Sequence, residues 1–434
     1  MFNKRPRIVF LYVMMSFAFL CFHLDVTHAI TLEEAFSTAL EHNELVNISR
    51  KNVVQAREKK NIVSSGLWPS LQLEVTRKKQ KTGGASFDSN RRNSIGVVRF
   101  TQPIYRGGKT WFGRWASQYN LKAARRNHFR RKQEILLNVA RRFYQVHLAR
   151  RHVEISRNAL ERAEKQLDRA KAQFEVQAIS RTPVLRAKVQ VADAREQLQR
   201  TKNNYDVARE EFALEIGYDT PPARLNVTDT PSVNPKSIEF YQAQALDSRR
   251  DLSEARFTLR KFRENVKVKK SSWFPSIDFK ATGEKFDEEI RSQEDDWTVS
   301  AVASYPLFNG WKDQSEIDKA RAQYRQSEQR IRRLKREIKL EVRRAYLNLQ
   351  SQKDVIETVE NRLESARENY QQVIAQFQEG VASSVDVSDA MTVFNEAEFR
   401  LANERTQYRL DWLRLQFAVG TFQEHRIQRE SELR

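Results

Sequence analysis

Apolar residues recur every three or four positions over two very long stretches of this chain, with charged residues between them. In the second stretch the apolar stripe runs from Ile331 to Phe377 and is interrupted at Lys353. Its mean step of about 3.5 residues keeps the stripe on one helix face and predicts coiled-coil packing. We therefore expect two long helices, each followed by a shorter one: 111–177 and 183–216, then 311–379 and 385–419.

A second pattern, strict alternation of apolar and polar residues, precedes each long helix. Leu71, Leu73 and Val75 alternate with polar neighbours, and the segment after residue 276 does the same. Tracts of about ten residues with this period have the length of tilted membrane-crossing strands, although soluble hairpins also alternate. The pattern predicts β-hairpins over residues 69–105 and 275–307. The tracts end near aromatic residues, which are typical of a membrane interface: Trp68, Trp273, Trp297 and Tyr305.

Each hairpin leads into its long helix through a similar corner, written PIYRGG in the first case and PLFNGW in the second. Pro103 and Pro306 lack an amide donor, so we expect them to end strand pairing. Gly107 and Gly310 allow the backbone to turn from a strand into a helix. The corner therefore marks where strand gives way to helix, twice in one chain.

The repeated corner belongs to an internal duplication. A shift of 203 residues places Gly107 on Gly310, Phe174 on Phe377 and Gly217 on Gly420. Chance heptad alignment would not also match the glycines at both ends. We expect a first repeat over residues 30–230, a second over 231–420 and a tail over 421–434. Each repeat opens with a helical stretch, over residues 31–65 and 236–272.

The element lengths limit how the chain can assemble. A helix over residues 111–177 would be about 100 Å long. Two hairpins supply four strands, whereas strands in lipid must close into a barrel, and the smallest barrels have about eight. Several chains must then share one barrel. The alternative is an exported, rod-like coiled coil that bridges envelope layers, but such a rod needs no paired strand tracts.

Residues 1–29 have the pattern of an export signal. Basic residues at 4, 5 and 7 precede an apolar run from Ile8 to Phe22, and small residues precede a cut after Ala29. The apolar run is short for a transmembrane anchor, which needs about 20 residues. The lone cysteine, Cys21, lies inside this segment, so the mature chain would have no disulfide.

Composition narrows the class of protein further. The 76 basic and 56 acidic residues give a formal net charge of +20, which permits nucleic-acid binding. The charges are interleaved along helices, however, as in LERAEKQLDRAKAQ from Leu160, which is the usual pattern of a solvated helix face. The sequence contains no phosphate-binding loop or nucleophile motif. We expect no enzymatic activity, no cofactor, no metal site and no nucleic-acid partner.

Several motifs resemble the TolC family of outer-membrane efflux proteins, and their order covers nearly the whole mature chain. They are TLEEAFSTALEHN (31–43), WFPSI (273–277), YPLFNG (305–310), LEVRRAYLNL (340–349), FQEGVASSVDVSDA (377–390) and AVGT (418–421). The resemblance implies a mainly helical protein with membrane strands. As a homotrimer it would form a twelve-stranded outer-membrane β-barrel continuous with a twelve-helix periplasmic α-barrel.

The resemblance also implies a function and partners. A protein of this family would lie in the outer membrane of a Gram-negative bacterium, in contact with lipid. It would accept substrates from an inner-membrane RND or ABC transporter through a periplasmic adaptor, for efflux or for type I secretion. The sequence does not distinguish between these two pathways.

The family pattern further suggests a periplasmic gate. Asp386 and Asp389 match the acids that narrow family channels, and their i, i+3 spacing puts both on one helix face. Acidic residues are also common at helix starts for electrostatic reasons, which is the alternative interpretation. Phe377 stands where the family has a hydrogen-bonding tyrosine, and Ala382 at a nearby arginine position, so the family's polar latch is not reproduced.

The two helix breaks are the predicted adaptor-docking tips. One lies between residues 178 and 183 and contains Ser180 and Thr182. The other lies between residues 380 and 384 and contains Gly380 and Ser383. Threonine before proline is a plausible helix start, and glycine a plausible helix stop.

Overall fold

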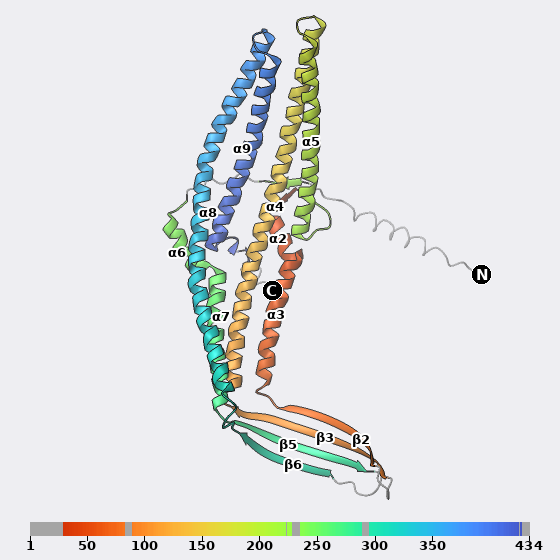
Figure 1. Cartoon of the computed structure of the whole chain (residues 1–434), viewed down its shortest axis with the longest axis vertical. Coiled ribbons are helices and arrows are strands. Elements are labelled where there is room, and N and C mark those ends of the chain that lie inside the picture. Colours follow the sequence, from red (N-terminus) through yellow and green to blue (C-terminus); the bar gives the residue numbers. More distant parts are fainter. Residues whose placement is uncertain are drawn as a thin grey trace, which may run out of the picture. The chain divides into compact units, whose positions relative to one another are not determined.

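The computed structural model describes residues 29–82, 89–222, 224–227, 235–288, 295–424 and 426–427 (Figure 1). The predicted export signal therefore lies outside the described residues except for Ala29, as does most of the predicted tail. The protein is mainly helical, as predicted. Its contacts divide the chain into two units, and each long helix contributes residues to both.

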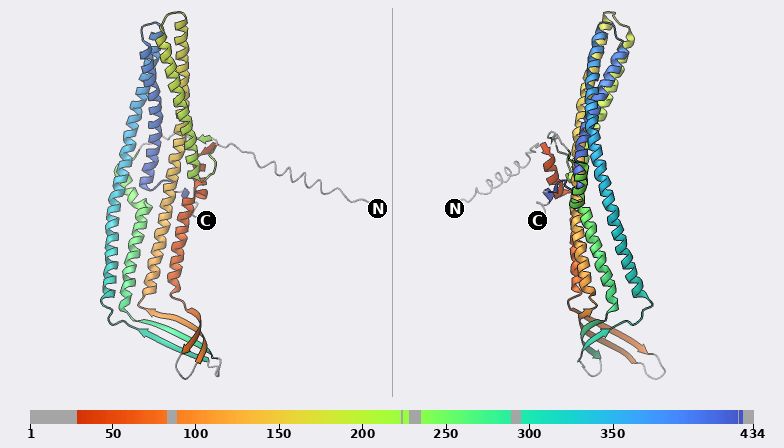
Figure 2. Two further views of the ribbon diagram at one scale, coloured as in Figure 1. Left: turned by 45° about the vertical axis from the view of Figure 1, so that its right-hand side comes forward. Right: turned by 90° about the vertical axis from the view of Figure 1, so that its left-hand side faces the viewer.

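Unit 1 consists of the described residues within Met1–Asn43, Leu136–Val233 and Gln352–Leu410. It contains all of α5 (Arg181–Ile216) and parts of three other helices, namely α4 (Lys109–Glu175), α8 (Lys312–Gln378) and α9 (Ser384–Val419). Helix α4 lies beside α5, and α8 lies beside α9 (Figures 1 and 2). Unit 1 also holds α2 (Leu32–His42) and the parallel strand pair β1 (Ala29–Thr31) and β4 (Arg224–Asn226).

The two helix pairs of unit 1 share one apolar core, which is why they pack together. The core takes alanines from α4, α8 and α9, so the helix backbones approach closely, and larger side chains fill the remaining space. Tyr370 of α8 stacks on Phe394 of α9, with ring centroids 5.7 Å apart. The buried members are Ala163, Val191, Ala366, Tyr370, Ala390, Met391, Phe394 and Ala397.

Unit 2 consists of the described residues within Glu44–Ile135, Asn234–Ser351 and Asp411–Arg434. Its antiparallel sheet has the order β2-β3-β5-β6, so β2 and β6 are the outer strands. The strands are β2 (Ser70–Thr82), β3 (Ser89–Arg106), β5 (Ser276–Glu288) and β6 (Asp295–Ser304), and they lie side by side (Figure 1). Unit 2 also contains α3 (Glu44–Ser65), α6 (Ile238–Ser248), α7 (Arg250–Lys270), the 3₁₀ turn η1 (Ser271–Trp273) and the remaining parts of α4, α8 and α9.

The outer strands carry large apolar side chains that the chain itself does not cover. Leu71 and Leu73 of β2 are each 72% exposed, and Trp297 of β6 is 79% exposed. Exposed apolar area of this kind marks an interaction surface in a folded protein. Within the described part of the chain, no helix has both the length and the apolarity needed to cross a membrane.

The opening helical stretch of each repeat is broken, which differs from the continuous stretches expected over 31–65 and 236–272. Asn43 separates α2 from α3, and Arg249 separates α6 from α7; both have extended backbone, with ψ of 126° and 124°. The Asn43 side chain donates to the carbonyl of Glu215 at 2.8 Å, and Arg249 donates to the carbonyl of Ala418 at 3.1 Å. Residues 215 and 418 are equivalent under the 203-residue shift, so the two repeats fix their breaks in the same way.

Glycine is required beside each of these breaks. Gly217 and Gly420 follow the last helix of their repeats with φ of 81° and 92°, in the left-handed region that favours glycine. A Cβ atom on Gly217 would lie 2.8 Å from the carbonyl carbon of His42. The equivalent atom on Gly420 would lie 3.1 Å from Cγ of Arg249. Close backbone approach, and not only helix termination, explains why the duplication aligns these glycines.

The strand-to-helix corners contain one correction. Pro103 does not end strand pairing, because β3 continues to pair with β5 at Tyr105 and Arg106 beyond a register shift. A bulge at this position absorbs the missing amide donor. Pro306 lies two residues after the end of β6 at Ser304.

Both corner glycines have positive φ, 59° at Gly107 and 65° at Gly310, but their surroundings differ. A Cβ atom on Gly107 would lie 2.4 Å from the carbonyl oxygen of Ser271, whereas nothing lies within 4 Å of one on Gly310. The first corner therefore needs glycine for space and for conformation. The second needs it for conformation alone.

Candidate functional site

The ends of the helix hairpins in unit 1 contain the predicted docking residues. Helix α5 begins at Arg181 with Ser180 as its N-cap, so Thr182 and Pro183 lie in its first turn. Helix α8 ends at Gln378, and Gly380 follows with φ of 77°. The Gly380 amide donates to the carbonyl of Phe377 at 3.2 Å, which closes the helix end. All four predicted tip residues are exposed: Ser180, Thr182, Gly380 and Ser383.

Asp386 takes part in the cap of α9. Its carboxylate accepts hydrogen bonds from the Ser383 amide at 2.8 Å and from the Ser383 hydroxyl at 2.7 Å. In return, the Asp386 amide donates to the Ser383 hydroxyl at 3.3 Å. These bonds from the Ser383 hydroxyl and amide lower the pKa of the Asp386 carboxyl. These bonds favour the ionised form of an acid at a helix start. This agrees with the alternative interpretation, in which Asp386 stabilises the start of α9.

The second acid and the aromatic residue of the predicted gate have different surroundings. Asp389 is exposed, as Asp386 is, whereas Val387 and Ala390 between and beside them are buried. The two acids therefore share one exposed face of α9, as their spacing predicted. Phe377 is only 6% exposed and packs inside the unit. The structure brings the two acids together but does not bring the Phe377 ring onto their face.

A polar link between the two helix pairs was not found from the sequence. Arg162 of α4 donates to Asn395 and to Glu398 of α9, both at 2.6 Å, and its guanidinium lies 4.7 Å from the centre of the Phe394 ring. The Arg162–Glu398 pair is mostly buried. Arg162 sits in an interleaved run of charges that is typical of solvated helix faces, so its neighbours gave no signal of this role.

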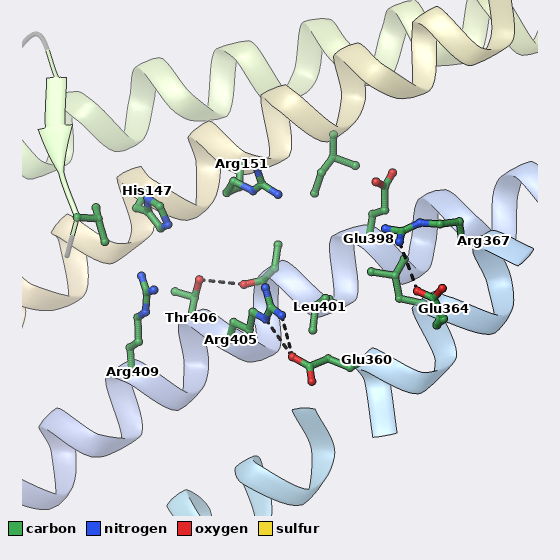
Figure 3. Close-up of a pocket in the computed structure, with 14 residues that line it drawn as sticks. His147, Arg151, Glu360, Glu364, Arg367, Glu398, Leu401, Arg405, Thr406 and Arg409 are labelled. Carbon is green, nitrogen blue, oxygen red and sulfur yellow. Dashed lines mark hydrogen bonds and ion pairs between the residues drawn. The ribbon is translucent and has the colours of Figure 1, made fainter. Parts of the chain in front are cut away.

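A pocket of about 650 Å³ in unit 1 lies among α4, α8 and α9 (Figure 3). His147 and Arg151 from α4 face Thr406 and Arg409 from α9 across it. Along its α8 side, Arg405 pairs with Glu360 at 2.8 Å. Burial and the nearby Arg409 lower the pKa of His147, so this imidazole is neutral at neutral pH.

The pocket does not have the features of a catalytic centre. Its acids are engaged in ion pairs, as Glu364 is with Arg367 at 3.3 Å. Among the described residues, no group of three or more histidine, cysteine or acidic side chains is placed to hold a metal ion. The pocket therefore has polar walls, but its lining does not place a nucleophile beside a base.

The family model described as "Outer membrane efflux protein" matches residues 35–217 and 242–421 of this chain. The chain belongs to the outer membrane efflux protein family. The resemblance seen in the sequence motifs is thereby confirmed. The two matched segments fall one in each expected repeat, so the family match follows the duplication.

Individual relatives of this outer membrane efflux protein are distant in sequence. It is 23% identical over 308 residues to the outer membrane protein TolC of Salmonella enteritidis, an alignment that covers 68% of this chain. The chain spans only 62% of the length of that relative.

Solved structures of channels share the fold of this chain. A crystal structure of CusC superposes with a TM-score of 0.80 at 19% identity, covering 90% of this chain and 92% of CusC. The outer membrane channel CmeC of Campylobacter jejuni superposes with a TM-score of 0.79 at 15% identity, covering 93% of this chain and 88% of CmeC. At these identities the likeness establishes the fold alone.

Proposed function

We propose that this protein is one subunit of a passive exit channel in the outer membrane of a Gram-negative bacterium. The observation that carries the proposal is the open-edged sheet of unit 2 in a member of the outer membrane efflux protein family. Its outer strands carry exposed apolar side chains that suit lipid, and each needs a partner strand. Three chains joined β6 to β2 would give a closed barrel of twelve strands.

The long helices extend this channel into the periplasm. Each chain would contribute four helical rods, two from the long helices and two from the shorter helices. Three chains would therefore form a twelve-helix tube. The exposed hairpin ends, with Ser180 and Thr182 in one and Gly380 and Ser383 in the other, are the proposed docking points for a periplasmic adaptor. The adaptor would connect the channel to an inner-membrane RND or ABC transporter, for efflux or type I secretion.

Asp386 and Asp389 are the proposed periplasmic constriction, and Phe377, which the sequence pattern grouped with them, is buried and does not share their face. Three chains would bring six carboxylates around one axis. Rings of acids attract cations and select for them in channels. The hydrogen bonds from Ser383 lower the pKa of the Asp386 carboxyl and so favour its charged form, whereas repulsion among the acids of three chains would act in the opposite direction.

Conductance in planar bilayers tests the constriction. The double variant D386N/D389N removes both charges but keeps oxygen acceptors for the Ser383 cap. We expect it to lose cation selectivity and block by multivalent cations while remaining trimeric. A matched control, D206A/E210A, removes two exposed acids from α5 and should conduct as the unmodified protein does. If both double variants keep full cation block, Asp386 and Asp389 are helix-start charges only.

A simpler experiment separates the channel from the exported coiled-coil rod. A barrel protein stays with outer membranes through high salt and migrates in electrophoresis as a trimer that heat dissociates. A rod without membrane strands is released by salt. Release by salt would refute the membrane channel whatever the behaviour of the two aspartates.

A further inference from the structure

Two histidines of α4, His147 and His152, lie where α4 meets α9 in unit 1. His152 packs against Phe399 of α9, with ring centroids 5.0 Å apart and ring planes at 71°. It also shares a side-chain hydrogen bond with Asn403 of α9. Five residues earlier on α4, His147 faces Arg409 of α9 across the pocket in Figure 3. Both imidazoles therefore belong to the contact that joins the two helix pairs of unit 1.

One ring nitrogen of His152 is buried and unpaired. Its Nε2 atom has no hydrogen-bond partner in the described part of the chain, so the bond with Asn403 uses Nδ1. With its proton on Nδ1, the neutral ring leaves Nε2 as a bare acceptor. Ser156 lies one helical turn further along the same face of α4, and its Oγ is likewise buried without a partner. Protonation of Nε2 would place a new N–H donor and a positive charge where no acceptor is bonded to it.

Nearby positive charge opposes the protonation of His147. Arg409 approaches this ring from α9, and Arg150 and Arg151 lie close to it on α4. Glu154 has the opposite effect, but it is paired with both of these neighbours, with Arg150 at 3.4 Å and with Arg151 at 2.8 Å. A second positive charge on the imidazole would therefore be repelled by the side chain that faces it from the partner helix.

Other charged groups around the two rings do not offset these effects. Residues 225–227, which line a second hollow beside His147, have no titratable side chain. The acids that line the pocket, or that adjoin Phe399 and Asn403 in the sequence, are held in ion pairs. These pairs are Glu398 with Arg162, Glu404 with Arg400, Glu360 with Arg405 and Glu364 with Arg367.

The direction of the pH effect follows from these surroundings. Burial lowers the pKa of both histidines; the three arginines lower that of His147 further, whereas the hydrogen bond with Asn403 opposes the change at His152. Once the helices separate, each imidazole regains an ordinary pKa of 6.5. The separated state therefore takes up protons first as the pH falls through 6.5, and it is favoured increasingly until the pH passes below the pKa of the packed state.

We propose that His147 and His152 make the contact between α4 and α9 an acid-sensitive joint, which holds at neutral pH and loosens when the two imidazoles take up protons. The joint lies within one chain and does not rest on the proposed channel. Arg162, which links the same two helices through Glu398, carries its charge at all these pH values and supplies no such switch.

A histidine NMR titration of the full-length protein tests the first part of the proposal. The single variants H147N and H152N assign the two imidazole signals. We expect both histidines to titrate below pH 6.5, the ordinary value. A pKa at or above 6.5 for either ring would overturn the joint, because its protonation would then not favour separation of the helices.

Hydrogen exchange tests whether the contact itself responds to pH. Leu401 and Thr406 are buried residues of α9, so their amides report on its packing. After correction for the intrinsic pH dependence of exchange, their protection should fall between about pH 8 and about pH 5. The fall should approach tenfold for each unit by which the two measured pKa values, taken together, lie below 6.5. Constant protection over this range would overturn the proposal.

Variants identify the groups responsible. H147N/H152N keeps polar side chains, with an N–H donor for Asn403, but removes both titrating rings, so the protection of α9 should no longer depend on pH. The matched control, H42N, removes an exposed histidine at the end of α2 and should keep the full pH dependence. If H147N/H152N loses as much protection on acidification as the unmodified protein, other groups cause the effect and the proposal fails. The titration and the exchange measured on the unmodified protein remain decisive even where the double variant is unstable.

Discussion

Gln133 offers a sharp test of how the segment after α9 is held. Its side chain is fully buried in unit 2, and its Nε2 donates to the carbonyls of Gly420 at 3.0 Å and Phe422 at 2.8 Å. Phe422 is itself fully buried. The variant Q133L keeps the approximate volume of the side chain but removes the donor. We expect it to free the segment around Phe422 locally without unfolding α4.

The expected free-energy change in Q133L is the cost of the two lost hydrogen bonds minus the cost of one unsatisfied acceptor that the substitution removes. Each of two buried carbonyls loses a donor, which costs about 1–3 kcal/mol apiece where nothing replaces it. Oε1 of Gln133 is buried without a partner, so the substitution also removes an unsatisfied acceptor worth about 1–3 kcal/mol. The net loss is about 2 kcal/mol, which corresponds to a roughly 30-fold increase in local opening.

Hydrogen exchange measures this opening directly. The amides of Gly420, Thr421 and Phe422 all donate to the carbonyl of Gln416, at 3.0, 3.1 and 3.2 Å, so they exchange only when the segment opens. In Q133L these amides should exchange about 30-fold faster. The matched control is Q166L, which removes another buried glutamine of α4 in unit 1 and should not affect them. Unchanged exchange in Q133L would refute the assignment of these two hydrogen bonds as the anchor of the segment.

Three further outcomes are expected. Gly217→Ala should destabilise the fold by about 2 kcal/mol or more in denaturation experiments, because the cost of a left-handed backbone adds to the cost of a clash. Gly380→Ala should cost only about 1 kcal/mol, since its φ is positive but its surroundings are open. Equal losses of stability in the two variants would contradict the clash. Ser383→Ala should raise the pKa of Asp386 toward its ordinary value in an NMR titration. A lowered carboxyl pKa stabilises the folded state at pH values above the ordinary aspartate pKa, and this stabilisation disappears as the pH falls through the pKa of the folded state. The variant should therefore lose this pH-dependent contribution to the free energy of unfolding. Arg162→Met should weaken the contact between the helix pairs by about 1–3 kcal/mol, which would be measured as faster hydrogen exchange of buried amides in α9. If these amides exchange at the rate of the unmodified protein, the apolar core alone holds the pairs together.

Periodicity predicted the long elements because each spans many turns and its apolar face is continuous. The first long helix, expected over 111–177, occupies Lys109–Glu175, and the second, expected over 311–379, occupies Lys312–Gln378. The breaks at Asn43 and Arg249 were missed, since a single extended residue does not interrupt the apolar pattern. Their cause is a hydrogen bond to a carbonyl about 170 residues away in the sequence.

The candidate site was predictable only in part for a similar reason. The shared exposed face of Asp386 and Asp389 follows from i, i+3 spacing, which is local. The burial of Phe377 and the link from Arg162 to Glu398 depend on which helices become neighbours. Pro103 was misread because proline excludes a hydrogen bond but not a bulged strand, and the partner strand decides between the two.

The outer strands β2 and β6 have a consequence for biogenesis. If their backbone groups are satisfied only by strands of other chains, the step that commits a chain to the bilayer is a reaction among several molecules and not a first-order event. A chain waiting for partners would expose Leu71, Leu73 and Trp297 to water. Its survival would then depend on chaperones and its loss on proteases. Halving the supply of chains should therefore reduce the number of finished channels by more than half.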